Sequence, residues 1–311
     1  MDGRLDLAHE RASLRSLVQG DRILVAPGAY DVLSAILIQQ AGFPCVYLGG
    51  NAATASTLGL PDLGLITMTE MRECVRRTAA RVDLPIIVDA DVGYGSLMLI
   101  QRTIREFEAA GASAIQIEDQ VGPKKCGHEL QREVVEVDEM IARLRAALDA
   151  RRKQETLIVA RTDARTTHGL KEAIRRGTAY AGAGADVVFV ESPESEDEFR
   201  EVARAIRAPL LANMVEGGRG PYLPWPRLQE LGFKIAIYPH SAVGSAARAV
   251  QTALSDIREH GWVERAQERM LTLHQYHDVL RFQEYLATER AYRGVGTAAI
   301  PDHPSSRDEG E

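Results

Sequence analysis

Ala114-Ile115-Gln116-Ile117-Glu118-Asp119 is the stretch that decides the fold. Its first four residues are mostly apolar and branched, which predicts a buried strand, and two carboxylates stand directly at the end of that strand. Seven further runs of this kind recur along the chain. The eight predicted strands are Ile23–Ala26, Cys45–Leu48, Ile86–Asp89, Ala114–Glu118, Leu157–Arg161, Val187–Glu191, Leu210–Asn213 and Ile235–Tyr238.

Longer segments with helical spacing lie between these strands, for example Arg102–Glu108 and Glu139–Leu144. Eight strands that alternate with helices predict an α/β fold whose parallel sheet closes as a (β/α)₈ barrel of the TIM type. The main alternative is a doubly wound open sheet. The count of eight speaks against it, and so does the lack of a Gly-x-Gly-x-x-Gly turn after an early strand.

The sequence predicts one domain over residues 1–311, with the barrel core at 12–240. Apolar residues at helical spacing over 242–259 and 263–290 predict a C-terminal helical extension, placed at 241–293. Such an extension suits an oligomer interface, although packing on its own barrel is an equally simple explanation. Small, charged and Pro-bearing residues predict a flexible tail at 294–311.

The composition fits a globular protein with a sizeable core. The chain has 311 residues, of which 45% are hydrophobic, and 37 Lys and Arg against 44 Asp and Glu give a net charge of −7. This charge gives no reason to bind nucleic acid or a membrane surface. Cys45, Cys74 and Cys126 are odd in number and widely spaced, which favours a reducing compartment. With no signal-peptide pattern or membrane span, the predicted location is cytoplasmic.

Charged or amide residues end five successive predicted strands. They are Asp89 and Asp91, Glu118 and Asp119, Arg161 and Asp163, Glu191, and Asn213. One such residue is usually a helix cap, but five at the carboxyl ends of barrel strands would converge on one mouth, where this fold builds its active sites. Carboxylates crowded there repel one another, so a cation is expected, and oxygen-only ligands favour Mg²⁺ over zinc.

Lys124-Lys125-Cys126-Gly127-His128 follows the fourth strand in a polar loop. Positive charge beside a thiol favours the thiolate, so Cys126 is expected to lose and regain a proton near neutral pH. The glycine lets the backbone come close to a ligand. A solvated basic turn is the plain alternative. A zinc pair of Cys126 and His128 is disfavoured because the sequence has no second pair of ligands nearby.

Several linked motifs make the chain resemble the isocitrate lyase/phosphoenolpyruvate mutase superfamily from about Val25 to Arg290. They are Pro27–Asp31, Leu60–Gly64, Val88–Gly95, Ile117–Gln120, Lys124–His128, Ala160–Ala164 and Asn213–Gly218. The resemblance implies a barrel whose last helix swaps between partners in a dimer or tetramer. Within the superfamily, the methylisocitrate lyase, 2-alkylmalate lyase and carboxyphosphonoenolpyruvate mutase-like branches are the most similar.

The resemblance also implies a set of site residues. Asp91 would contact Mg²⁺, with Mn²⁺ as the alternative ion, and Asp89, Glu118 and Asp62 would hold its waters. The substrate-binding residues would be Tyr47, Gly49, Gly50, Asn51, Gly127, Arg161, Glu191 and Asn213. The catalytic residues would be Cys126 as the acid/base thiol, Lys124, His128, Arg161 and Glu191, with 124–128 forming a mobile lid.

The implied activity is Mg²⁺-dependent cleavage of a carbon–carbon bond in a small di- or tricarboxylate. A 2-hydroxy-dicarboxylate, such as a 2-alkylmalate or 2-methylisocitrate, would give an α-keto acid and a second carboxylate. The chain departs from the lyase pattern at Gly49, where Ser is usual, at Asn51, where a small residue is usual, and at Gln116, where His is common. A phosphonate mutase and an oxaloacetate hydrolase or decarboxylase therefore remain alternatives. A non-catalytic barrel is disfavoured because the key residues are present.

Overall fold

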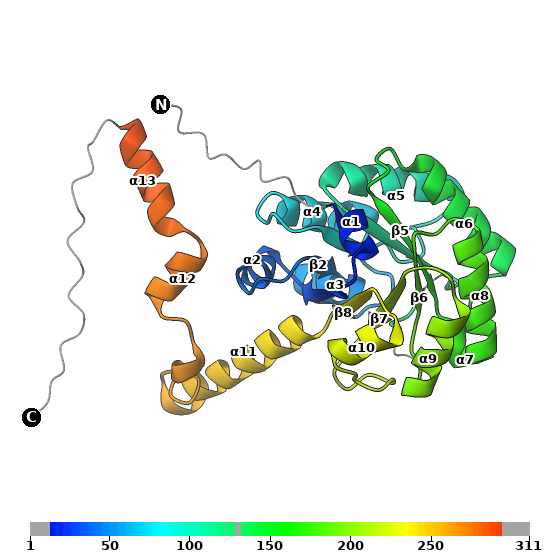
Figure 1. Cartoon of the computed structure of the whole chain (residues 1–311). Coiled ribbons are helices and arrows are strands. Elements are labelled where there is room, and N and C mark those ends of the chain that lie inside the picture. The colour runs from blue at the N-terminus through cyan, green and yellow to red at the C-terminus, as the bar shows by residue number, and fades with distance from the viewer. Residues whose placement is uncertain (1–12, 123, 128–131, 294–311) are drawn as a thin grey trace, which may run out of the picture. The chain divides into compact units, whose positions relative to one another are not determined.

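The computed structural model describes residues 13–122, 124–127 and 132–293. Its centre is a closed barrel of eight parallel strands that follow one another in chain order. The strands are β1 Leu24–Ala29, β2 Val46–Leu48, β3 Ile86–Asp89, β4 Ala114–Glu118, β5 Leu157–Thr162, β6 Val187–Val190, β7 Leu210–Asn213 and β8 Ile235–Tyr238. The predicted (β/α)₈ barrel is thus confirmed (Figure 1).

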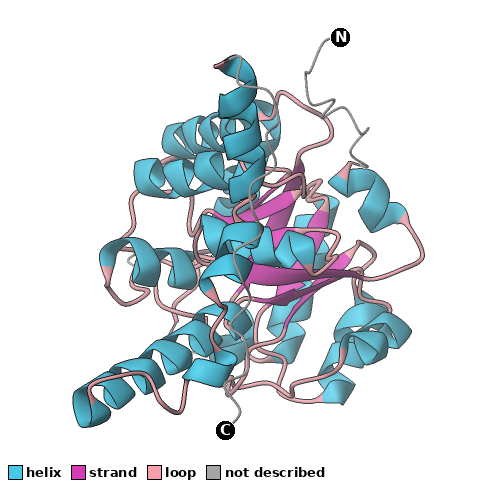
Figure 2. Cartoon of the chain, turned by 90° about the vertical axis from the view of Figure 1, so that its left-hand side faces the viewer, coloured by secondary structure: helices cyan, strands magenta, loops and turns pink. Residues whose placement is uncertain are grey.

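Helices connect the strands and surround them, with the sheet at the centre in Figure 2. They are α1 Leu14–Gln19, α2 Val32–Gln40, α3 Gly50–Leu58, α4 Met68–Ala79, α5 Leu97–Ala110, α6 Val137–Ala150, α7 Ala164–His168, α8 Leu170–Gly182, α9 Glu196–Ala205 and α10 Trp225–Leu231. Local sequence fixes several of their starts. Thr67 and Glu70, for example, form a reciprocal capping box that satisfies free N–H groups at the beginning of α4.

The first strand is longer than its sequence suggested. A Pro-Gly pair is typical of a turn, yet Pro27 and Gly28 continue β1 and pair with β8 and β2 respectively. Gly28 lies so close to Pro239 that an added Cβ would be 2.6 Å from its backbone atoms. The glycine therefore permits the tight contact by which β1 and β8 close the barrel.

The inside of the barrel is packed rather than hollow. A cluster of buried side chains from most of the strands includes Tyr47, Ile87, Val159, Phe189 and Ile237. Two further clusters fill the space between the sheet and the surrounding helices. The packed interior leaves the carboxyl ends of the strands as the place for a site.

The chain divides into two compact units, at Ala249 and Val250, within the long helix α11 Ser241–His260. The continuous helix expected over 263–290 is interrupted. It consists of a 3₁₀ turn at Gln267–Arg269 and two helices, α12 Leu273–Val279 and α13 Phe282–Tyr292. Arg281 stands between the two helices with a left-handed φ of 58°, which breaks the helical path. The predicted tail, 294–311, lies outside the described residues.

Across the described ranges, no helix is both long and apolar enough to cross a membrane.

Candidate active site

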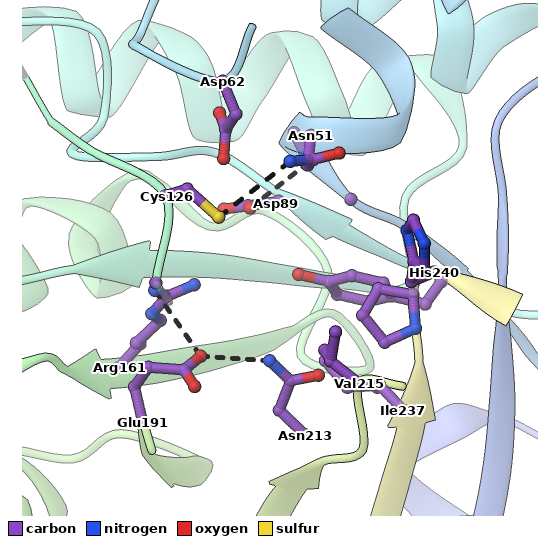
Figure 3. A pocket seen from close by; sticks show the side chains of 15 residues that line it. Asn51, Asp62, Asp89, Cys126, Arg161, Glu191, Asn213, Val215, Ile237 and His240 are labelled. Atoms are coloured by element: carbon purple, nitrogen blue, oxygen red, sulfur yellow. Dashed lines mark hydrogen bonds and ion pairs between the residues drawn. The ribbon is translucent and has the colours of Figure 1, made fainter. Parts of the chain in front are cut away.

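A pocket opens at the carboxyl ends of the strands, and most of the predicted site residues line it (Figure 3). Its lining includes Tyr47, Gly49, Gly50, Asn51, Asp62, Asp89, Cys126, Gly127, Arg161, Glu191 and Asn213. Three more predicted residues, Asp91, Glu118 and Lys124, are buried and contact or approach members of this lining. His128 lies outside the described residues.

Four carboxylates gather on one side of the site around the Lys124 side chain. Its ammonium forms an ion pair with Asp62 and a second one with Asp91, at 2.8 Å from the Asp91 Oδ1. Burial raises the pKa of Asp91 to about 6, and the like charge of Asp89 adds to this effect while Lys124 opposes it. Burial also raises the pKa of Glu118 well above its usual range. The raised pKa values show that one ammonium does not fully compensate the negative form of these buried carboxylates, so a further cation would stabilise it.

The arrangement of these carboxylates fits a hard metal ion. Both oxygens of Glu118 are buried and accept no hydrogen bond from the described residues, although one lies 3.4 Å from the Arg161 Nε. Buried acceptors without donors call for a cation or an ordered water. Within the described residues, no three His, Cys, Asp or Glu side chains are close enough to share one ion directly. The donor set thus suits an ion such as Mg²⁺, which keeps several waters and takes only one or two carboxylates.

The first turn of α3 supplies backbone donors to the same side. The Gly50 N–H donates to the Asp89 Oδ2 at 3.3 Å. A Cβ at Gly50 would lie 3.0 Å from the Asp91 Oδ1, and one at Gly49 would lie 2.8 Å from the Tyr47 ring. These contacts give a physical reason for glycine at both positions. They also place a helix N-terminus, which favours anions, at the edge of the pocket.

Gln116 binds the carboxylate of Asp89 through a hydrogen bond, a role that its position in the sequence did not reveal. Its Nε2 donates to the Asp89 Oδ1 at 3.1 Å, and its Oε1 accepts from the Tyr47 hydroxyl at 3.4 Å. An amide in the middle of an otherwise apolar strand was the available signal. Gln116 thus fixes the orientation of a carboxylate that the sequence did identify.

Arg161 dominates the opposite wall. Its guanidinium makes two hydrogen bonds to Asp163, at 2.8 and 3.0 Å, and lies 3.5 Å from Glu191. Burial alone would lower the pKa of Arg161, but the carboxylates of Asp163, Glu118 and Glu191 outweigh it and raise that pKa. Asn213 donates to Glu191 at 3.1 Å. This wall offers a fixed cation and polar groups to an anionic ligand.

The remaining side of the pocket is formed by Val215, Ile237, Pro239 and His240. The sequence analysis had assigned none of these four residues to the site. Cys126 faces the pocket from the loop after β4, and the Asn51 side-chain amide lies 3.9 Å from its sulfur. A thiol, a cluster of carboxylates, a buried guanidinium and a partly apolar wall thus meet in one pocket.

Known proteins resemble this chain over most of its length. The family described as Phosphoenolpyruvate phosphomutase matches residues 14–258. A 2,3-dimethylmalate lyase of Eubacterium barkeri is 42% identical over 90% of this chain and 97% of its own. A 2-methylisocitrate lyase of Aeropyrum pernix is 41% identical over 94% of each chain. The structure of a phosphonopyruvate hydrolase in complex with oxalate and Mg²⁺ is 29% identical, with a TM-score of 0.81 over 90% of this chain and 98% of that one.

Proposed function

Because the chain belongs to the isocitrate lyase/phosphoenolpyruvate mutase superfamily, we propose that it is a carbon–carbon lyase acting on a 2-hydroxy-dicarboxylate. The products are an α-keto acid and a second carboxylate. The observation that carries the proposal is that the Cys126 thiol lines one pocket with the buried Arg161 guanidinium and the Asp89 carboxylate. Together these groups provide what cleavage needs: a proton donor, a fixed cation and a site for a metal.

The reaction requires the hydroxyl proton to pass to a base, for which the pocket offers the Glu191 carboxylate. The bond between the hydroxyl-bearing carbon and its neighbour must then break, and the neighbouring carbon must gain a proton. Arg161 binds a substrate carboxylate or the developing alkoxide, since its fork of N–H donors matches paired oxygens. Cys126 donates the proton to the carbon that becomes the second product. The Gly49–Asn51 turn binds a carboxylate at the N-terminus of α3.

Asp91 and the neighbouring carboxylates Asp89 and Glu118 would hold Mg²⁺. When bound, the ion supplies positive charge beside the oxygens of the keto-acid half. Removing the direct ligand in Asp91→Ala is expected to abolish binding of Mn²⁺, followed by electron paramagnetic resonance as a probe for Mg²⁺. Asp89→Ala should weaken binding less, because the resemblance implies that Asp89 would hold a water of the ion and not the ion itself. Unchanged Mn²⁺ affinity in Asp91→Ala would refute this metal assignment.

An alkyl-substituted substrate suits the pocket best. Val215, Ile237 and Pro239 give one side an apolar lining, where an alkyl group loses its contact with water favourably. A substituent carrying a third carboxylate would instead place a charge against these three apolar side chains, with His240 as the polar neighbour on the same side. A 2-alkylmalate is therefore the preferred substrate over 2-methylisocitrate.

The test is a panel of small acids incubated with the enzyme and Mg²⁺. It contains 2-methylmalate, 2,3-dimethylmalate, 2-methylisocitrate, oxaloacetate and phosphonopyruvate. We expect pyruvate release from an alkylmalate, measured by coupling to lactate dehydrogenase. Oxalate release from oxaloacetate alone would support a hydrolase instead, and new phosphorus NMR signals from phosphonopyruvate alone would support phosphonate chemistry. Either result would overturn the lyase proposal.

A homo-oligomer, a dimer or tetramer, completes the proposal. Helix α11 carries Val250, Leu254 and Ile257 at helical spacing, and their side chains are 56%, 61% and 47% exposed in the single chain. An apolar stripe of this kind is a common contact surface between subunits.

A further inference from the structure

The segment Lys125-Cys126-Gly127 is held at both ends by side chains that lie outside it. At one end, Gln120 makes two hydrogen bonds to the backbone of Lys125. Its Nε2 donates to the Lys125 carbonyl at 3.0 Å, and its Oε1 accepts from the Lys125 N–H at 2.9 Å. At the other end, the Ser192 hydroxyl lies 3.1 Å from the Gly127 carbonyl and can donate to it. Cys126 is the one residue between these two attachments.

Gln120 is itself fixed to the barrel. Its side chain is only 1% exposed, and its backbone pairs with Val134 in an antiparallel bridge. Its carbonyl accepts a hydrogen bond from Arg143 of α6 at 3.1 Å. These contacts fix the position of Lys125 relative to the end of β4 and to α6, so that it does not depend on the loop alone.

Ser192 is fixed by its backbone conformation. It is 5% exposed and has a φ of 58°, in the left-handed region that non-glycine residues seldom adopt. This conformation places its hydroxyl within reach of the Gly127 carbonyl and also of the Glu191 Oε1, at 3.0 Å. Such unfavourable conformations persist where the surrounding structure requires them, and they cluster at functional sites. The hydroxyl has one proton and donates to one of these two oxygens at a time, and the bond to the Gly127 carbonyl connects the loop to the end of β6.

We propose that Gln120 and Ser192 are positioning residues that together set the place of the Cys126 thiol in the pocket. The inference rests on the proposed function, in which that thiol delivers a proton to carbon. Proton delivery requires close contact, and a displacement of roughly 1 Å can cost about 10²-fold in rate. A loop by itself is a less exact support than a strand, and these two side chains connect the loop to strands.

The test compares Gln120→Met and Ser192→Gly with the control Gln229→Met. Methionine keeps the length of glutamine without its amide, and glycine removes the hydroxyl while it tolerates the positive φ. Gln229 also accepts from a backbone N–H, that of Ile23, but at the opposite end of the barrel. A general loss of stability would therefore appear in the control as well, whereas a loss of positioning would not.

Two measurements are made on each protein. The first is the alkylation rate of Cys126 by iodoacetamide relative to that of Cys74 in the same sample, read by mass spectrometry of the peptides. Cys74 is also partly buried, so it is an internal reference. Each variant should raise the relative rate at Cys126 roughly 3- to 10-fold, the size expected for one or two lost neutral hydrogen bonds. The second is steady-state kinetics, where kcat should fall by about tenfold or more while KM changes less than about twofold.

The proposal is overturned if the relative alkylation rate and kcat of both variants match those of the control. Should Gln120→Met fail to fold, Ser192→Gly and Ser192→Ala keep the test decisive. Both variants lack the hydroxyl, and only in the Ala variant is the positive φ at this position strained. The alkylation ratio needs no substrate. If the wild-type enzyme releases no keto acid from any diacid, the proposed function fails, while the ratio still reports whether these residues hold Cys126.

Discussion

At the scale of single residues, Cys126 is the side chain on which the proposed lyase mechanism most depends. Cys126→Ser replaces a thiol of ordinary pKa about 8.5 with a hydroxyl that hardly ionises. We expect kcat to fall about 10²- to 10⁴-fold, the usual contribution of general acid–base catalysis. Mn²⁺ binding should survive, because those contacts come from the strand ends. A near-normal rate on the best diacid would remove the thiol from the mechanism.

Cys45 gives a prediction about pH dependence. Burial raises the pKa of its thiol to about 12. Since the pKa is higher in the folded than in the unfolded protein, the stabilising effect is complete below the unfolded value and is lost as the pH rises towards the folded one. At pH 8 only about 10⁻⁴ of the folded thiol would be ionised. Cys45 should thus resist iodoacetamide at pH 8 until urea unfolds the protein, and rapid alkylation in the native state would contradict the buried assignment.

Part of the site could be predicted from the sequence, because its residues stand at the carboxyl ends of predicted strands. Asp89, Arg161 and Glu191 each follow a buried apolar run, and the parallel barrel brings such positions together. Asp163 and Ser192 come directly after two of these strands, but their side chains form hydrogen bonds with other parts of the site. Asp163 accepts from Arg161, and Ser192 donates to the Gly127 carbonyl. Contacts of this kind depend on backbone conformation and loop path, which leave no periodic pattern in the sequence.

At the scale of elements, the Cys126 loop comes close to residues at the ends of β5 and β6. A Cβ at Gly127 would lie 2.4 Å from the Arg161 Nη2 and 3.0 Å from Glu191. Gly127→Ala should therefore displace the loop or the guanidinium and lower kcat/KM by about 10²-fold. Gly122→Ala is the matched control, because an added Cβ there meets no atom of the described part of the chain within 4 Å. Equal kinetics for the two variants would show that the reaction does not depend on this position of the loop.

The elements themselves were mostly predictable, and their exceptions have local causes. The alternation of apolar runs with helical segments along the sequence predicts the first and last residues of β3, β4, β7 and β8 correctly. The first strand was expected to end at Ala26, but Pro27 and Gly28 pair with β8 and β2 and so continue β1. The break at Arg281 depends on one left-handed residue in a sequence that otherwise has helical spacing.

At the scale of the whole molecule, the exposed stripe on α11 predicts a self-associating surface. Leu254→Asp places a charge in the middle of Val250, Leu254 and Ile257 and should lower the molar mass measured by light scattering after size-exclusion chromatography. Gln251→Asp adds the same charge at a neighbouring exposed position outside this stripe and should leave the mass unchanged. A wild-type mass equal to one chain would refute the oligomer.

The closure of the barrel has a consequence for how the chain folds. Most strands pair with the next strand along the sequence, but Leu24 pairs with Ile235. Joining such distant segments costs loop entropy before it yields any contact, which makes closure slow relative to the formation of the successive units. During synthesis the outer edge of β1 stays without a partner until β8 has left the ribosome. For that interval the growing chain has an open sheet edge on which another chain can pair.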